Sequence, residues 1–383
     1  MRKSTWDAVV LGAGPSGSAV AAELAERGWK VLLTDKASFP REKVCGGFVG
    51  PENYEWLHQK GLWNRFLETG ASPIRKVWMT TANGASLRMH FSKQGSGVSG
   101  LAVCRTDFDQ ALVKLAESSG AIVRTSFKMQ SKEKEFAQFL DLKSGETEEI
   151  KSSVWIDARG AGGRSEGDKP AAFGVMAFFE NVRWMNQQVV LHFVEGGHFG
   201  LNPVNSKKTA ICYVAEKKLM DRAQGDMEKM LEIFRQANPF IDRQMKFAKC
   251  ISAWRGIPVP PVRKPRFFDG DCFFVGDAVT AVNPVVGGGM TMAIQSGRIL
   301  ANSLSVNLPD QVILRDVAAL YEKEWKKLYQ MKTHFSHGWG WLSHRDWAAN
   351  RVLGFFASRK NIFRTVFEMH HPTSLAGNAG GVQ

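Results

Sequence analysis

The sequence is poor in cysteine and lacks any segment apolar enough to cross a membrane. Its 383 residues include five cysteines, an odd number, and none stand in a C-x-x-C pair. A disulfide scaffold and a cysteine zinc site are therefore not expected, no metal site is predicted, and free thiols fit a reducing compartment. No apolar run reaches the roughly 18 residues of a membrane span, and no secretion signal precedes the first apolar run. We expect a cytoplasmic protein.

Acidic residues are outnumbered by basic ones. Lys and Arg number 50 and Asp and Glu 37, which gives a net charge of +13. This favours an anionic partner such as a dinucleotide, an acidic lipid surface or nucleic acid. No nucleic-acid-binding module is recognisable, so nucleic acid is not predicted as a partner. The length and the 44% hydrophobic content are typical of a globular protein of two or three domains.

The first 35 residues have the pattern of a strand, a glycine turn, a helix and a second strand. An apolar run over 8–11 leads into Gly12-Ala13-Gly14-Pro15-Ser16-Gly17, a helix is predicted over 18–27, and a strand over 31–34 ends at Asp35. Glycines in this pattern permit a tight turn, close approach to a pyrophosphate and close helix packing. Asp35 stands where a ribose-binding acid is expected, which disfavours the 2′-phosphate of NADP. The unit predicts dinucleotide binding.

A second signal lies near the other end of the chain. A predicted strand over 272–275 is followed by Gly276 and Asp277, and then by a glycine loop before a helix predicted over 288–303. The loop reads Pro284-Val285-Val286-Gly287-Gly288-Gly289-Met290. An acid after a buried strand accepts hydrogen bonds from a sugar-alcohol chain, and a glycine loop at a helix start lies against a flat ring. Ordinary strand–turn–helix packing is the alternative.

Taken together, these motifs resemble the FAD-dependent oxidoreductase superfamily of aromatic hydroxylases, geranylgeranyl reductases and flavin halogenases. The resemblance also rests on Arg105 before Asp109 and on the run Lys43-Val44-Cys45-Gly46-Gly47, which is most similar to the geranylgeranyl reductase branch. It implies FAD as the cofactor, a hydrophobic small-molecule substrate and an external electron donor of the NAD(P)H kind.

The resemblance also implies the site residues. It places the pyrophosphate at the first turn, the adenosine ribose at Asp35 and the flavin ring at the late loop. The residues implied in cofactor binding are Gly12, Ala13, Gly14, Pro15, Ser16, Gly17, Asp35, Lys36, Arg41, Gly46, Gly47, Arg105, Asp277, Pro284, Gly287, Gly288, Gly289 and Met290. Cys45 is the implied catalytic candidate, as an acid or redox partner near the flavin, or else a small residue that accommodates the Gly46-Gly47 turn.

Several positions depart from the family patterns. The Trp-x-Trp-x-Ile-Pro signature of the halogenases is missing, and its slot reads His198-Phe199-Gly200-Leu201-Asn202-Pro203, so halogenation is disfavoured. Gly200 also stands where isoprenoid reductases carry a cavity tryptophan, which implies a roomier or differently lined cavity. Asp157-Ala158 replaces the acid–glycine pair of aromatic hydroxylases. His192 and His198 are either substrate-side acid–base groups or structural residues.

The segment after residue 310 combines aromatic and basic side chains. The aromatic residues are Tyr321, Trp325, Tyr329, Phe335, Trp339, Trp341, Trp347, Phe355, Phe356 and Phe363, and the basic ones Lys326, Lys327, Lys332, Arg345, Arg351, Arg359, Lys360 and Arg364. Three interpretations stay open: peripheral contact with an anionic membrane, a flap over the substrate cavity, and core packing with a solvated face.

We predict an α/β fold with a Rossmann-like FAD-binding domain, an inserted mainly antiparallel β substrate domain and a C-terminal helical region. The predicted ranges are 1–171 and 261–308 for the two parts of the FAD-binding domain (the first with some substrate-domain elements), 172–260 for the substrate domain, 309–372 for the helical region and 373–383 for a flexible tail. The predicted function is that of a geranylgeranyl reductase-like oxidoreductase. The alternative is a monooxygenase of a polyketide-like or aromatic substrate; a halogenase and a non-catalytic, membrane-docked flavoprotein are less favoured.

Overall fold

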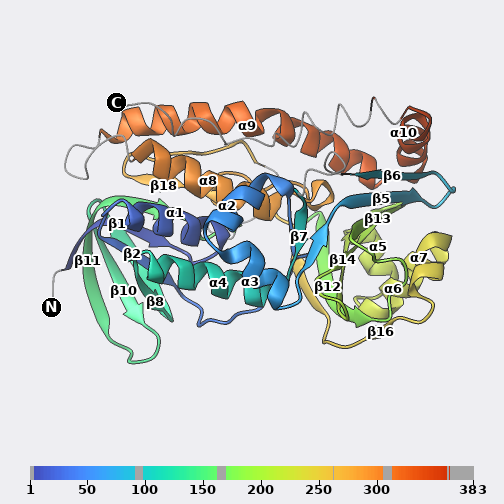
Figure 1. Ribbon diagram of the computed structural model, residues 1–383, viewed down its shortest axis with the longest axis horizontal. Helices are drawn as coiled ribbons and strands as arrows, with labels where there is room; N and C mark the ends of the chain where they lie inside the picture. Colours follow the sequence, from blue (N-terminus) through green and yellow to red (C-terminus); the bar gives the residue numbers. More distant parts are fainter. Residues whose placement is uncertain are drawn as a thin grey trace.

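Two large β-sheets lie at opposite ends of an elongated molecule, and the C-terminal helices run along one side (Figure 1). The computed structural model describes residues 4–90, 98–161, 170–261, 263–304, 313–359 and 362. The predicted α/β class is confirmed, with a parallel-type sheet, a mainly antiparallel sheet and terminal helices. The predicted boundaries between domains stay a prediction, and the tail from residue 373 lies outside the described residues.

The first sheet contains both dinucleotide-type signals. Its strands are β1 (Ser4–Leu11), β2 (Val31–Asp35), β8 (Ile122–Thr125), β9 (Phe127–Glu133), β10 (Phe136–Asp141), β11 (Thr147–Asp157) and β18 (Cys272–Phe274). β1, β2, β8, β11 and β18 pair in parallel, whereas β9 and β10 form an antiparallel extension of β11. β11 is continuous over its eleven residues. Its first half pairs with β10 and its last three residues pair with β18.

Three helices pack on this sheet and against one another: α1 (Pro15–Glu26), α4 (Arg105–Ser118) and α8 (Gly289–Leu304). The contact between α1 and α8 is so close that a Cβ on Gly297 would lie 2.4 Å from the Ser16 carbonyl oxygen. Since α8 follows the late glycine loop, this contact brings the two ends of the chain together. The buried apolar residues of both ends share one core.

The second sheet is mainly antiparallel. Its strands are β5 (Lys76–Thr81), β6 (Ser86–His90), β12 (Ala172–Glu180), β13 (Gln188–Val194), β14 (Gly197–Pro203), β15 (Thr209–Glu216), β16 (Lys249–Cys250) and β17 (Arg255–Pro258). Only the β5–β13 pair is parallel among the described strands of this sheet. β5 and β6 come from the first part of the chain.

Three helices follow β15 in the chain: α5 (Lys217–Arg222), α6 (Met227–Ala237) and α7 (Pro239–Met245). α5 and α7 have seven residues or fewer each, too few for a clear helical period in the sequence. Met230 and Phe234 of α6 and Ile241 of α7 pack with Tyr213 in the core of this sheet.

A small sheet and short helices connect the two large sheets. They are β3 (Phe48–Val49), β4 (Ser72–Ile74), β7 (Gly100–Ala102), α2 (Tyr54–Gln59), α3 (Leu62–Glu68) and the 3₁₀ turns η1 (Pro51–Asn53), η3 (Gly276–Ala278) and η4 (Pro284–Val286). Leu101 and Val49 pack with Met290 of α8 and with Ala19 of α1. These contacts therefore hold the segment that follows residues 43–47 against α1 and α8.

The C-terminal helices α9 (Leu314–Ser343) and α10 (Asp346–Ser358) lie along the outside (Figure 1). Tyr321, Trp325 and Tyr329 recur every four residues and are at most 3% exposed, in the core shared with α8. Core packing therefore explains these three aromatic residues, while Trp341 and Trp347 stay exposed. Lys360, Phe363 and Arg364 lie outside the described residues. None of the helices in the described ranges has the length and apolar character needed to cross a bilayer.

Candidate functional site

A cavity of about 1060 Å³ extends from the first glycine turn to the second sheet. Gly14 and Ser16 line one end, Cys45 and Gly289 the middle, and Leu191 the other end. The volume lies at the upper end of the roughly 300–1,000 Å³ typical of small-molecule sites. Segments almost three hundred residues apart thus share one site, as the sequence predicted for a single cofactor.

The first turn combines tight backbone packing with an open face. Gly12 has φ 105°, and a Cβ there would lie 2.7 Å from the Ala158 carbonyl oxygen. A Cβ on Gly17 would lie 1.9 Å from the Gly12 oxygen. Gly14 instead meets only Arg41 Nη2, at 3.4 Å from its Cβ position. Because α1 has no side-chain cap, its first N–H groups remain available to an anion beside Gly14.

Asp35 stabilises this turn by hydrogen bonds and also lines the cavity. Its Oδ2 accepts a hydrogen bond from Ala13 N at 2.9 Å, and its Oδ1 accepts one from Ala37 N at 2.8 Å. A carboxylate offers about four lone-pair sites, so both oxygens can still accept a bond from a ribose hydroxyl. The position of Asp35 at the end of β2 therefore fits an adenosine ribose.

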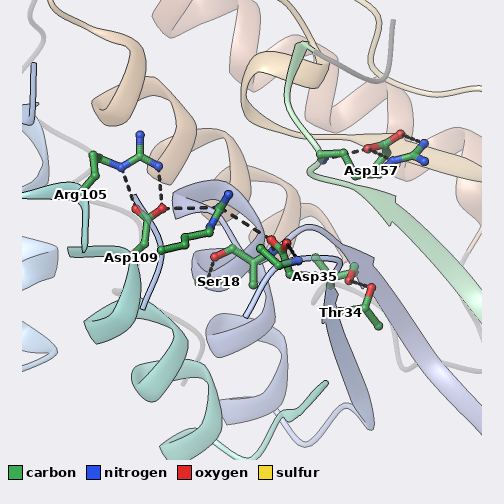
Figure 2. Close-up of polar contacts among 11 residues, drawn as sticks. Ser18, Thr34, Asp35, Arg105, Asp109 and Asp157 are labelled. Atoms are coloured by element: carbon green, nitrogen blue, oxygen red, sulfur yellow. Dashed lines mark hydrogen bonds and ion pairs between the residues drawn. The ribbon is translucent and has the colours of Figure 1, made fainter. Parts of the chain in front are cut away.

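Two arginines and two acids form a buried network beside the turn (Figure 2). Arg105 Nε and Nη2 donate to the two oxygens of Asp109 at 2.8 and 2.7 Å. Arg41 Nη2 lies 3.5 Å from Asp109 Oδ2 and 3.7 Å from Asp35 Oδ2. Burial alone would lower the pKa of Arg105, but the Asp109 carboxylate outweighs it and raises that pKa. Arg41 Nε is buried with no hydrogen-bond partner among the described residues, which suits an added anion.

Lys43 was not among the predicted cofactor residues, yet it lines the cavity near Asp277. A Cβ on Gly160 would lie 4.0 Å from both Lys43 Nζ and Asp277 Cβ. Burial lowers the pKa of Lys43, with Arg105 adding to the effect. Burial raises the pKa of Asp277, while Lys43 and Arg105 oppose that rise. The only sequence signal for Lys43 was its place two residues before Cys45.

The late glycine loop opens onto the cavity at Gly289. No atom lies within 4 Å of the Cβ position of Gly289, so a flat ring has room to approach the backbone there. Cys45 lies beside this opening, because its Sγ contacts Met290 Sδ at 3.6 Å and accepts a bond from Gly47 N at 3.4 Å. Cys45 therefore faces the start of α8, as expected of a group beside the ring.

Most of the predicted cofactor residues line this cavity. The exceptions are Ala13, Gly17 and Gly288. Ala13 contributes its backbone N–H to Asp35, and Gly17 permits the approach of α1 to the turn. Gly288 faces Lys332 of α9, whose Cε would lie 2.7 Å from a Cβ at that position. These three residues therefore support the site through backbone contacts and close packing rather than by lining the cavity.

The two candidate histidines have different surroundings. His192 lies outside the cavity and is hydrogen-bonded to Thr80 Oγ1 at 2.7 Å and to Gln244 Oε1 at 2.9 Å. Burial lowers the pKa of His192 to about 4. His198 lines the cavity, and burial together with His344 lowers its pKa to about 3. His192 is thus held as a structural residue, and His198 alone of the two lines the cavity.

Of the Asp157-Ala158 pair, Ala158 lines the cavity, whereas Asp157 does not. Asp157 forms an ion pair with Arg159 at 2.6 Å, shown apart from the arginine network in Figure 2. Ala158 N donates to the Leu11 carbonyl at 2.8 Å, which continues the pairing of β1 with β11. Asp157 therefore positions Arg159, which lines the cavity.

Comparison with known proteins agrees with this geometry. The chain is 39% identical over 116 residues to a menaquinone reductase of Mycobacterium tuberculosis, a match covering 30% of this chain and only 28% of that relative. It is 24% identical to a digeranylgeranylglycerophospholipid reductase of Methanosarcina acetivorans, over 85% of this chain and 81% of that one. The flavin-dependent brominase Bmp2 shares the fold, with a TM-score of 0.80 at 15% identity over 96% and 93% of the two chains.

The FAD binding domain family matches residues 5–312, which span the first turn, the second sheet and the late loop. That range includes both ends of the cavity and the parallel sheet from which its glycine turns project. The chain belongs to the FAD binding domain family.

Proposed function

We propose that this protein is an oxidoreductase that uses reduced FAD to saturate a carbon–carbon double bond in a hydrophobic small molecule. The observation that carries the proposal is the continuity of the cavity from the dinucleotide turn to an apolar wall. That wall belongs to β5 and β13 and consists of Val77, Met79, Val189, Leu191 and Phe193. Relatives named as reductases of a quinone and of an isoprenoid lipid support the same substrate class.

The residues present fit FAD in one direction along the cavity. The first N–H groups of α1 and the unpartnered Nε of Arg41 suit the pyrophosphate, and Asp35 suits the adenosine ribose. Asp277 suits the ribityl hydroxyls, and the open backbone at Gly289 suits the ring. Bound there, FAD would supply the hydride, while the protein orients it against the apolar wall.

Cys45 is the proposed proton donor for this reaction. Saturating a double bond adds a hydride to one carbon and a proton to the other, and the thiolate left behind regains its proton from solvent. The thiol lies between the ring position at Gly289 and the second sheet, where its Sγ contacts Met290 Sδ at 3.6 Å. A thioether is a weak acceptor, so this contact leaves the thiol proton available.

The test is an anaerobic single turnover. FAD-loaded protein is reduced with dithionite, NADH or NADPH, and is then offered an isoprenoid alcohol without oxygen. The proposal expects reoxidation of the flavin and a product heavier by two hydrogens in mass spectrometry. A product that forms only after air is admitted, and that has gained an oxygen atom, would establish a monooxygenase and refute the proposal.

We further propose that the outer side of α9 and α10 contacts an anionic lipid surface that supplies the substrate. Trp341, Trp347 and Phe355 are 51%, 56% and 47% exposed. Arg345 lies 4.5 Å from the Trp341 ring centroid and Arg359 4.6 Å from that of Phe355, so cations accompany the exposed rings. This combination suits the headgroup layer of a membrane.

Vesicle flotation tests this contact. The wild-type protein is expected to float with vesicles that contain anionic lipid. The Trp341→Ser, Trp347→Ser double variant is expected to remain in the bottom fraction with the unbound protein. The matched control is Trp184→Ser, which replaces an indole of similar exposure, 42%, between β12 and β13. Equal flotation of the double variant and the control would contradict the proposal.

A further inference from the structure

A lysine from the C-terminal helix reaches the wall of the cavity. Lys332 of α9 lines the cavity, although it is only 4% exposed. Its Nζ lies 3.6 Å from Glu52 Oε1, beyond hydrogen-bond distance, and has no hydrogen-bond partner among the described residues. Burying an ammonium group without hydrogen-bond partners costs free energy, and an anionic ligand in the cavity would offset that cost.

The same ammonium lies directly against the late glycine loop. A Cβ on Gly288 would lie 2.7 Å from Lys332 Cε and 2.8 Å from its Nζ. α8 begins at the next residue, Gly289, where the first N–H groups of a helix carry partial positive charge. The cation of α9 and the start of α8 therefore place two sources of positive charge at one point of the cavity.

We propose that Lys332 tunes the cofactor: its ammonium and the start of α8 together stabilise the negative charge that two-electron reduction leaves on the pyrimidine edge of the flavin ring. This inference rests on the ring position given under "Proposed function". The α9 helix thereby makes the bound flavin easier to reduce. The Glu52 carboxylate, which lies 3.6 Å from the ammonium, opposes the effect. At an effective dielectric of about 20, a unit charge several ångströms away shifts an equilibrium tenfold or more.

The reduction potential of the bound flavin tests this, measured by equilibrating the FAD-loaded full chain with a reference dye. Lys332→Met is expected to shift the two-electron equilibrium at least tenfold toward the oxidised form, which lowers the potential by about 30 mV or more. Lys332→Arg keeps the charge and is expected to restore most of the wild-type potential. Glu52→Gln is expected to shift the potential in the opposite direction, because it removes the opposing charge.

Gly288→Ala provides a second variant that leaves the lysine in the chain. Its methyl group would displace the flexible end of Lys332, so the potential is expected to fall as it does in Lys332→Met. An unchanged potential in both variants, with FAD bound in full stoichiometry, would overturn the inference.

Gly289→Val distinguishes an incorrect role for Lys332 from an incorrect position of the flavin ring. Its side chain would fill the open space at the backbone and is expected to perturb the visible spectrum of the flavin or prevent its binding. If Gly289→Val changes the spectrum while Lys332→Met leaves the potential unchanged, only the role of Lys332 is refuted. If Gly289→Val changes neither spectrum nor binding, the ring lies elsewhere and the inference falls with its premise.

Discussion

Asp109→Asn tests the buried arginine network directly. Asp109 is fully buried and receives two hydrogen bonds from Arg105, which is 7% exposed, and Arg41 lies 3.5 Å away. The amide keeps the shape of the carboxylate but removes its charge and turns one acceptor into a donor facing the guanidinium. Removing one partner of a buried ion pair typically costs about 3–5 kcal/mol.

The matched control is Asp107→Asn. Asp107 is exposed in the first turn of the same helix, so this variant changes the net charge equally. Its expected cost is about 0.3–1 kcal/mol, from a weaker interaction with the helix dipole. Urea unfolding of the FAD-free protein measures both variants. If Asp109→Asn loses no more stability than the control, Asp109 does not hold the arginines as described.

FAD affinity gives the experiment a second readout. Without Asp109, the folded variant leaves Arg41 and Arg105 less neutralised beside the proposed pyrophosphate site. We therefore expect FAD, titrated by the quenching of its fluorescence, to bind Asp109→Asn at least as tightly as the wild type under conditions where both are folded. A folded variant with much weaker FAD binding would show that these arginines do not face the phosphates.

Three further substitutions test other parts of the account. Cys45→Ala is expected to retain FAD and to slow turnover by about 100-fold or more, as loss of a general acid does. The control Cys250→Ala, at a residue outside the cavity lining, should leave turnover unchanged. Equal turnover rates in the two variants would exclude Cys45 as the proton donor. Gly200→Trp should lower turnover of long isoprenoid substrates at least tenfold and leave FAD binding intact, because Gly200 lines the cavity beside Leu191. Unchanged turnover would place the substrate elsewhere. Burial lowers the pKa of His192 from 6.5 to about 4. Between these two pH values only the unfolded chain takes up the proton, so the free energy of unfolding falls by about 1.4 kcal/mol for each unit by which the pH is lowered. His192→Gln should make this fall shallower by that amount, measured by urea unfolding at several pH values. Parallel curves for the variant and the wild type would contradict the assigned shift.

The first turn was predictable from sequence because its constraints are local. The strand before Gly12, the helix after Pro15 and the acid at the end of β2 follow one another within 35 residues, and backbone sterics at Gly12 and Gly17 leave few alternatives. The same holds for the strand, Asp277 and the glycine loop before α8. Short-range patterns therefore predicted most of the cofactor end of the cavity.

The remaining features depend on contacts between distant segments. Lys332 belongs to an ordinary helical pattern, and only the packing of α9 on α8 brings it to Gly288. β5 joins the second sheet by parallel pairing with β13, more than a hundred residues later, and no local signal marks that register. His192 and His198 occupy alternate faces of neighbouring strands, so only the sheet geometry separates the buried residue from the one that faces the cavity.

A crystal structure of the FAD-loaded protein is the most direct test of the central claim. The account predicts one FAD per chain, with its pyrophosphate beside Gly14 and Arg41 and its ring over Gly289, facing Cys45. A ring bound away from Gly289, or phosphates bound away from the start of α1, would contradict it.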